Sequence, residues 1–94
     1  SIYFGTSTGL NRYDKATEDA VKLVDGVVPN SIHVDDQHIW FTNLEDEQVW
    51  RVDLDGQNPR TWGVGGGQPD VIAGNDTFVF ITTDQDGRVA RLAK

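Results

Sequence analysis

The stretch "HIWFTNLEDEQVWRVDLDGQN" at residues 38–58 holds two apolar segments around an acidic turn and ends in an Asp-Gly turn pattern. Its residues Ile39, Trp40 and Phe41 stand side by side, whereas a strand with one wet face alternates apolar with polar residues. Strands that are buried on both faces read as continuous apolar runs. We therefore expect these three residues to form a strand that is covered by protein on both sides.

The same pattern recurs along the chain, which indicates an internal repeat. Three apolar segments align at nearly equal intervals: "IYFGT" (Ile2–Thr6), "IWFTN" (Ile39–Asn43) and "FVFIT" (Phe78–Thr82). A polar turn and a second expected strand follow each of them: Leu10–Asp14, Val49–Asp53 and Val89–Ala93. Two further strands are expected at Ala20–Val24 and Arg60–Val64. Pro29 and Pro69 each open another strand, at matching points of the repeat.

Four short strands about every 37–40 residues are the period of a β-propeller blade. We predict an all-β fold of about 2.5 four-stranded antiparallel blades. Residues 1–28 form a blade without its innermost strand, 29–68 a complete blade, and 69–94 a blade without its outermost strand. The expected core between blades consists of Ile2, Phe4, Ile39, Trp40, Phe41, Phe78 and Phe80.

Such a chain is incomplete as a propeller, because closure usually takes at least about four blades. A repeat unit also cannot bury its faces without neighbours. We expect either a homo-oligomer, for example two copies that contribute six blades, or pairing with further propeller chain. The chain has no Met and begins at Ser1 within an expected strand. We therefore expect a processed chain, a piece excised from a longer one, or an engineered blade array.

Two stretches resemble known propeller repeats. "FGTSTGLNRYDKAT" (Phe4–Thr17) resembles the sensor propellers of bacterial two-component regulators. "IWFTNLEDEQVWRVDLDGQN" (residues 39–58) is similar to NHL-type, YWTD-type and streptogramin-lyase-like propellers. These resemblances imply blade architecture. The Glu that ends the lyase strand motif is replaced here by Asn43, Thr6 and Thr82, which argues against lyase chemistry.

The net charge of −7 argues against some classes of partner. Nucleic acid and anionic membrane surfaces are bound by Lys and Arg, so neither is expected. The many Asp residues fit either ordinary acidic solubility or adaptation to high salt. The absence of Cys excludes disulfides and thiolate metal sites, and no cofactor is expected. The compartment is not fixed by the sequence, although an extracellular or periplasmic one is favoured.

Few residues suggest chemistry. His33 and Asp35 share one face of an expected innermost strand and are candidates for a general base or a metal site. Trp62 is a candidate for stacking on a glycan. The Asp-Gly sequences at Asp55 and Asp86 fit tight turns better than Ca²⁺ loops, and we expect no catalytic residue and no metal.

The sequence thus favours a non-catalytic scaffold or interaction module; the alternatives are a lyase-like enzyme fragment and a glycan-binding propeller. The small-molecule or glycan ligand, if any, is unknown.

Overall fold

The computed structural model describes residues 1–64, 68–83 and 87–94, which form ten strands in three antiparallel sheets. The N-terminal sheet contains β1 (Ile2–Thr6), β2 (Gly9–Asp14) and β3 (Asp19–Asp25). The central sheet contains β4 (Pro29–Val34), β5 (His38–Asn43), β6 (Gln48–Asp53) and β7 (Arg60–Trp62). The C-terminal sheet contains β8 (Pro69–Gly74), β9 (Phe78–Thr83) and β10 (Val89–Ala93). The predicted all-β class is confirmed, and the arrangement is consistent with an incomplete blade array.

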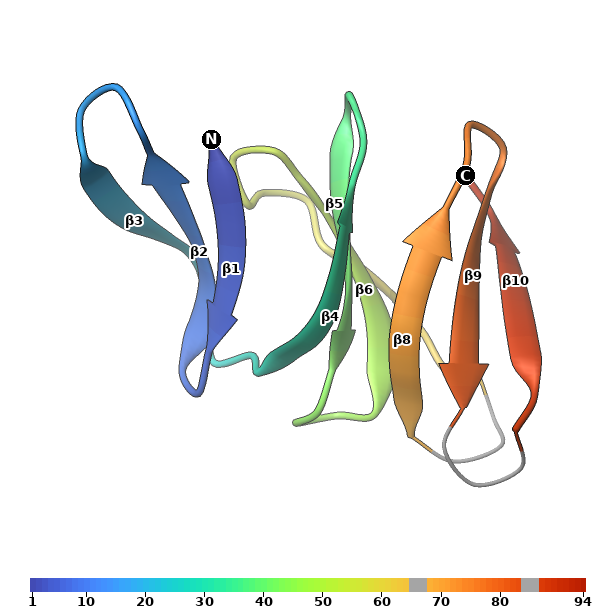
Figure 1. Ribbon diagram of the computed structural model, residues 1–94. Helices are drawn as coiled ribbons and strands as arrows, with labels where there is room; N and C mark the ends of the chain where they lie inside the picture. The colour runs from blue at the N-terminus through green and yellow to red at the C-terminus, as the bar shows by residue number, and fades with distance from the viewer. Residues whose placement is uncertain (65–67, 84–86) are drawn as a thin grey trace.

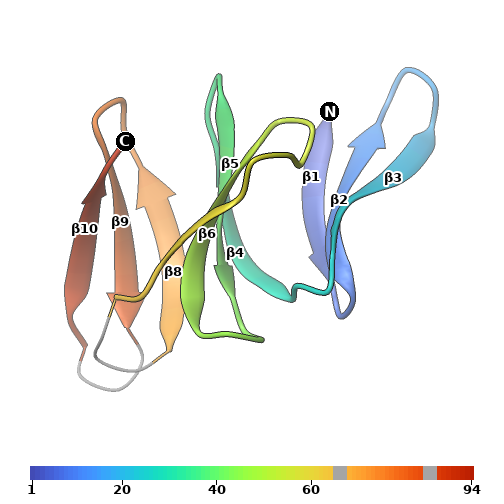
Figure 2. The same ribbon diagram turned by 180° about the vertical axis from the view of Figure 1, so that it is seen from behind.

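The three sheets stand in a row, with the central sheet between the other two (Figures 1 and 2). Within each sheet, strands that follow one another in sequence pair with one another. The first strand of the central sheet, β4, lies beside both β1 and β8. The array is elongated, with extents of 42 × 28 × 20 Å. In the described ranges no helix is long and apolar enough to cross a membrane.

Strand β5 is covered on both faces, which explains its continuous apolar run. Because side chains alternate along a strand, Ile39 and Phe41 point to one side and Trp40 to the other. Ile39 and Phe41 pack with Leu10 of the N-terminal sheet, and Trp40 packs with Ile72 of the C-terminal sheet. The side chains of Ile39, Trp40 and Phe41 are 0% exposed.

Two hydrophobic clusters hold the row together, one in each gap between sheets. The first gap is filled by the buried residues Leu10, Val27, Ile39, Phe41 and Val52. The second gap is filled by the buried residues Trp40, Val49, Ile72, Val79 and Ile81. The central sheet contributes to both clusters, so each end sheet is attached to the molecule through one face only.

Equivalent strands of the central and C-terminal sheets begin at a constant interval in the sequence. The alignment of Phe78 with Ile39 in the sequence analysis is therefore wrong by one position. Strand β5 begins at His38 and β9 begins at Phe78, in step with Pro29 and Pro69 at the starts of β4 and β8. Val79 and Ile81 face the central sheet, so they correspond to Ile39 and Phe41. A shift by one position moves every side chain of a strand to the opposite face. Phe78 and Phe80 therefore lie on the outer face of the C-terminal sheet, away from the central sheet.

Four of the residues expected in the core between blades do not lie between two sheets of this chain. Ile2 is 45% exposed, and Phe4, Phe78 and Phe80 are half-buried. Ile2 and Phe4 alternate with Tyr3, which packs toward the central sheet, so they point outward from the N-terminal sheet. The physical reason is their place in the row: these faces belong to the first and last sheets.

The hairpin turns follow the expected side-chain chemistry. Gly56 in the Asp-Gly turn has a φ of 87°, a conformation that favours glycine. A Cβ at this position would also lie 2.5 Å from the carbonyl oxygen of Leu23, so the neighbouring sheet approaches closely. The second expected Asp-Gly turn begins at Asp84–Asp86, which lies outside the described residues, as do residues 65–67 of the glycine-rich segment 63–70.

The two repeat positions Phe41 and Phe4 provide a matched test of this packing. Phe41→Ala is expected to lower the free energy of unfolding by about 3–5 kcal/mol, because it leaves a cavity between two sheets. Phe4→Ala is expected to cost about 1 kcal/mol, because a half-exposed ring buries less area. Urea denaturation at a concentration where only single chains are present measures both values. Equal costs at the two positions would contradict the assignment of Phe4 to an outer face.

Candidate functional site

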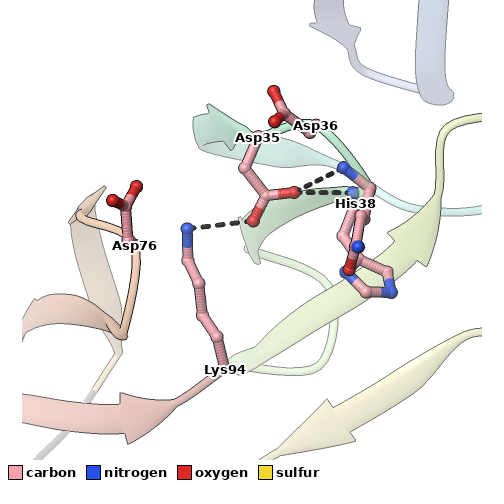
Figure 3. A pocket seen from close by; sticks show the side chains of 6 residues that line it. Asp35, Asp36, His38, Asp76 and Lys94 are labelled. Carbon is pink, nitrogen blue, oxygen red and sulfur yellow. Dashed lines mark hydrogen bonds and ion pairs between the residues drawn. The ribbon is translucent and has the colours of Figure 1, made fainter.

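A polar cavity of about 370 Å³ lies where the turns of the central and C-terminal sheets meet (Figure 3). The turn between β4 and β5 forms one side of it, and the turn between β8 and β9 forms another. Its lining residues are Asp35, Asp36, Gln37, His38, Asp76 and Lys94. The site therefore combines three carboxylates with one ammonium group and one imidazole.

Lys94, which follows β10, joins the two polar residues singled out from the sequence. Its Nζ lies 2.9 Å from Oδ2 of Asp35 and 3.2 Å from Nε2 of His33. His33 points toward the C-terminal sheet, where a Cβ on Gly74 would lie 2.6 Å from its Nε2. The glycine thus makes room for the imidazole between two neighbouring strands. The structure brings His33 and Asp35 together through a lysine that the sequence analysis did not consider.

Asp35 also shapes the turn that carries it. Its Oδ1 accepts hydrogen bonds from the backbone N–H groups of Gln37 and His38, at 2.9 and 2.8 Å (Figure 3). Partial burial raises the pKa of Asp35, but the hydrogen bonds from Lys94 and from these two backbone groups outweigh it. The net effect holds the pKa of Asp35 well below its ordinary value, so the carboxylate is ionised at neutral pH.

The turn of the next repeat is built in the same way. Oδ1 of Asn75 accepts hydrogen bonds from the backbone N–H groups of Thr77 and Phe78, both at 2.9 Å. Asp35 and Asn75 hold equivalent places in the two repeats, each just ahead of the strand that follows the turn. The shared role of Asp35 is therefore to close the turn, and the contact with Lys94 is the addition specific to Asp35.

The surroundings of His33 lower its pKa and so favour the neutral imidazole. Burial lowers the pKa of His33, the positive charge of Lys94 lowers it further, and Asp35 opposes the shift. Neutral imidazole can accept a hydrogen bond from the Lys94 ammonium through Nε2. The cluster Asp35–Lys94–His33 is thus internally paired, with each charged or basic atom engaged by another member. That arrangement ties the end of β10 to the central sheet.

Other lining residues of the cavity add negative charge. Among the described residues no group of three or more His, Cys, Asp or Glu side chains is arranged to hold a metal ion. Asp36 and Asp76 also line the cavity, and of the described residues in its lining Lys94 alone carries a permanent positive charge. The interactions that the structure shows in this cavity are the ion pair between Asp35 and Lys94 and the hydrogen bonds that Asp35 accepts within its turn.

Trp62, the candidate for glycan stacking, is engaged within the chain. Its ring stacks on Trp40 with 5.4 Å between centroids and an interplanar angle of 19°. The guanidinium groups of Arg51 and Arg60 lie 5.6 and 5.1 Å from the centroid of the Trp62 ring. The ring that a sugar would use is thus engaged by three side chains of the chain itself, and Trp62 remains partly exposed.

A recurring pair of side chains was missed from the sequence. In each sheet an aromatic residue lies directly opposite an arginine on the neighbouring strand: Tyr3 and Arg12, Trp40 and Arg51, Phe80 and Arg91. The guanidinium of Arg91 also lies 4.3 Å from the centroid of the Phe78 ring. The regular spacing of the arginines was visible in the sequence, but the alignment error at β9 concealed the aromatic partner of Arg91.

The outermost faces of the row are the other candidate site. We define the N-terminal outer face by Ile2, Phe4, Asn11 and Tyr13, which point away from the central sheet. We define the C-terminal outer face by Phe78, Phe80, Val89 and Arg91, which also point away from it. Both faces carry apolar side chains and no sheet of this chain covers them in the described residues.

Comparison with known proteins gave no family: no family model matches the chain, and no curated protein matches it.

Substitutions at Asp35 separate its two roles. Asp35→Asn should keep the turn, as Asn75 does in the next repeat, and lose only the ion pair, which costs less than about 1 kcal/mol of the free energy of unfolding. Asp35→Ala removes the turn hydrogen bonds as well and should cost about 1–2 kcal/mol more. Urea denaturation of the two variants measures both costs, and equal costs would contradict the role of Asp35 in closing the turn.

The same pair predicts a pH dependence. The folded-state pKa of Asp35 is below its unfolded value, so its contribution to stability is complete above about pH 5 and is lost as the pH falls. The stability difference between the wild type and Asp35→Asn should therefore shrink on acidification below that pH. Thermal unfolding across pH measures it, and a difference that grows on acidification would contradict the ion pair.

Lys94→Met tests the neutral state of His33. Removing the ammonium group takes away one of the causes that lower the pKa of His33, so the titration midpoint of this imidazole should move upward. Two-dimensional NMR of the histidine ring protons measures the midpoint directly. The contact would be refuted by a midpoint that stays in place or moves down.

Proposed function

We propose that this chain is a non-catalytic interaction module whose two outer sheet faces bind further β-sheets of the same blade type. The observation that carries the proposal concerns one repeat position. Leu10, Val49 and Val89 hold equivalent places opposite Gly5, Thr42 and Thr82 on the neighbouring strand. Leu10 and Val49 are 0% exposed between sheets, whereas Val89 is 64% exposed on the C-terminal outer face.

The N-terminal outer face supports the same conclusion from the opposite side. Ile2, Ile39 and Val79 are equivalent in the repeat, and each points toward the preceding sheet where there is one. Ile39 and Val79 are 0% exposed, whereas Ile2 is 45% exposed. Inside the chain, one kind of contact between neighbouring sheets occurs twice. The C-terminal outer face carries the residues of one side of that contact, and the N-terminal outer face carries the residues of the other side.

The energy available from covering these faces is substantial. Fully burying an aliphatic side chain contributes about 1.5–3 kcal/mol. Ile2 and Val89 are 45% and 64% exposed within one chain, so covering each of them contributes a part of that amount. Contiguous exposed apolar patches on small proteins commonly mark interaction sites. Each face also carries a polar side chain beside its aromatic residues: the Arg91 guanidinium lies over the Phe78 ring on one face, and Asn11 stands opposite Phe4 on the other.

The alternatives have less support. A lyase-like or metal-dependent enzyme would need His33 or Asp35 free to react, but both contact Lys94. A glycan-binding surface would need the ring of Trp62, which stacks on Trp40. No described contact favours either function, so only the interaction module is proposed.

The net charge of the chain predicts how its association should depend on salt concentration. Each chain carries a formal charge of −7, so two copies repel one another in dilute buffer. Salt shortens the range of this repulsion, with a Debye length of about 8 Å at physiological ionic strength and about 3 Å at 1 M. Association through apolar faces should accordingly strengthen as salt is added, opposite to an association held by surface ion pairs.

Sedimentation of the purified chain tests the proposal. We expect the wild type to sediment as more than one chain in high salt, and Val89→Glu to sediment as one chain, because the substitution places a charge in the apolar contact. Leu44→Glu is the matched control: Leu44 is also exposed, at 40%, but lies in the turn after β5 and away from both outer faces.

The control variant should keep the wild-type mass and its salt dependence. A wild type that sediments as a single chain at every salt and protein concentration, with a cooperative melt, would overturn self-association through these faces. Equal loss of association in Leu44→Glu and Val89→Glu would remove the role of the C-terminal outer face.

A further inference from the structure

We infer that the sheet that covers each outer face comes from a second copy of this chain, docked head to tail. The N-terminal outer face of one copy packs on the C-terminal outer face of the other. The inference rests on the proposed function and gives its partner and its polarity. It starts from the two contacts between sheets inside the chain, which use residues at equivalent positions of the repeat.

Each gap between sheets is filled by the same trio of repeat positions. In the first gap, Leu10 of the N-terminal sheet packs with Ile39 and Phe41 of the central sheet. In the second gap, Val49 of the central sheet packs with Val79 and Ile81 of the C-terminal sheet. One member always comes from the second strand of the hairpin in the earlier sheet, and two come from the first strand of the hairpin in the later sheet.

The outer faces hold the separated members of a third trio. The position of Leu10 and Val49 is held by Val89 on the C-terminal outer face. The positions of the two partners are held by Ile2 and Phe4 on the N-terminal outer face. Joining Val89 of one copy to Ile2 and Phe4 of the next therefore repeats the internal contact with aliphatic and aromatic side chains of the same kind.

The aromatic–arginine pair fits the same direction of packing. Tyr3 and Trp40 both pack into the gap that leads to the following sheet, and Phe80 is their equivalent on the C-terminal outer face. Arg91 stands opposite Phe80, so it enters the proposed contact together with the ring. The N-terminal outer face brings the phenol oxygen of Tyr13 to that contact, and this oxygen can accept a hydrogen bond from a guanidinium group.

The internal packing also argues against a contact between two identical faces. In both gaps a face that looks toward the following sheet meets a face that looks toward the preceding one. A symmetric pairing of two C-terminal outer faces would place Val89 against Val89 and two Arg91 side chains in one apolar contact, where like charges repel. It would also leave Ile2 and Phe4 exposed. A head-to-tail contact covers both faces and has the heterologous symmetry that generates rings.

Two variants test the polarity, each carrying a charge on one outer face. Ile2→Glu alters the N-terminal outer face and Val89→Glu the C-terminal one, and both positions are exposed within one chain, so each variant should fold. Circular dichroism of each variant, compared with that of the wild type, checks that it is folded. Every head-to-tail contact uses one face of each kind, so each variant alone should be a single chain, whereas the Leu44→Glu control assembles like the wild type.

Mixing the two variants gives the decisive result. The Ile2→Glu copy still has a native C-terminal outer face, and the Val89→Glu copy still has a native N-terminal outer face. One native contact can therefore form between them, and native mass spectrometry should show a complex of one copy of each, with one variant labelled with ¹⁵N. No complex in the mixture, from a wild type that assembles, would overturn the head-to-tail contact.

Other outcomes are equally clear. Loss of assembly in Val89→Glu but not in Ile2→Glu would identify a symmetric contact between C-terminal outer faces; it would refute this inference and leave the proposed function standing. A wild type that never assembles would overturn both. Complex formation between the two variants, together with single chains for each one alone, would establish the second copy as the occupant.

Discussion

The alternation of side chains along a single strand is the constraint on which the rest of the molecule depends. Strand β5 sends Ile39 and Phe41 into one gap and Trp40 into the other, so it must be apolar at successive positions. Both end sheets are joined to the molecule through this central layer. A polar residue at any of these three positions would place a polar group in the hydrophobic cluster between two sheets.

The polar side chains of Asp35, Asn75 and Lys94 stabilise the turns and one of the contacts between sheets. Asp35 and Asn75 close equivalent turns, and Lys94 links the last strand to the first of these turns. These contacts lie at the ends of the strands, whereas the apolar side chains lie on the sheet faces. The contacts of Lys94 thus link the C-terminal sheet to the central one, the hydrogen bonds of Asp35 and Asn75 shape the turns within each sheet, and the sheet faces supply the area for packing.

Much of the fold was predictable because its strands are short, regular and marked by the same residues in each repeat. The continuous run in β5 predicted coverage on both faces, and the recurrence of Pro at Pro29 and Pro69 predicted the start of equivalent strands. The alignment of β9 failed because Phe78, Val79 and Phe80 are all apolar, so hydrophobicity alone does not choose between the two faces. The spacing of the turn residues Asp35 and Asn75 carries that information.

The polar cluster was predictable only in part. Strand alternation placed His33 and Asp35 on one face, but Lys94, which follows β10, is distant from them in sequence, and no local pattern encodes that proximity. The arginines opposite Tyr3, Trp40 and Phe80 were likewise hidden until the register of β9 was known. Long-range placement is thus the part of this site that a single sequence does not reveal.

The attachment of each end sheet through one face has a consequence for how the molecule opens. In arrays where units contact only their neighbours, stability is approximately a sum of local terms and nearest-neighbour terms. An end sheet can therefore detach by breaking one gap, whereas release of the central sheet requires both gaps to open. Amide protons in β5 should accordingly report the global unfolding reaction, and those in β3 and β10 a fraying that precedes it. Closure into a ring would abolish this difference, because a ring has no end sheets.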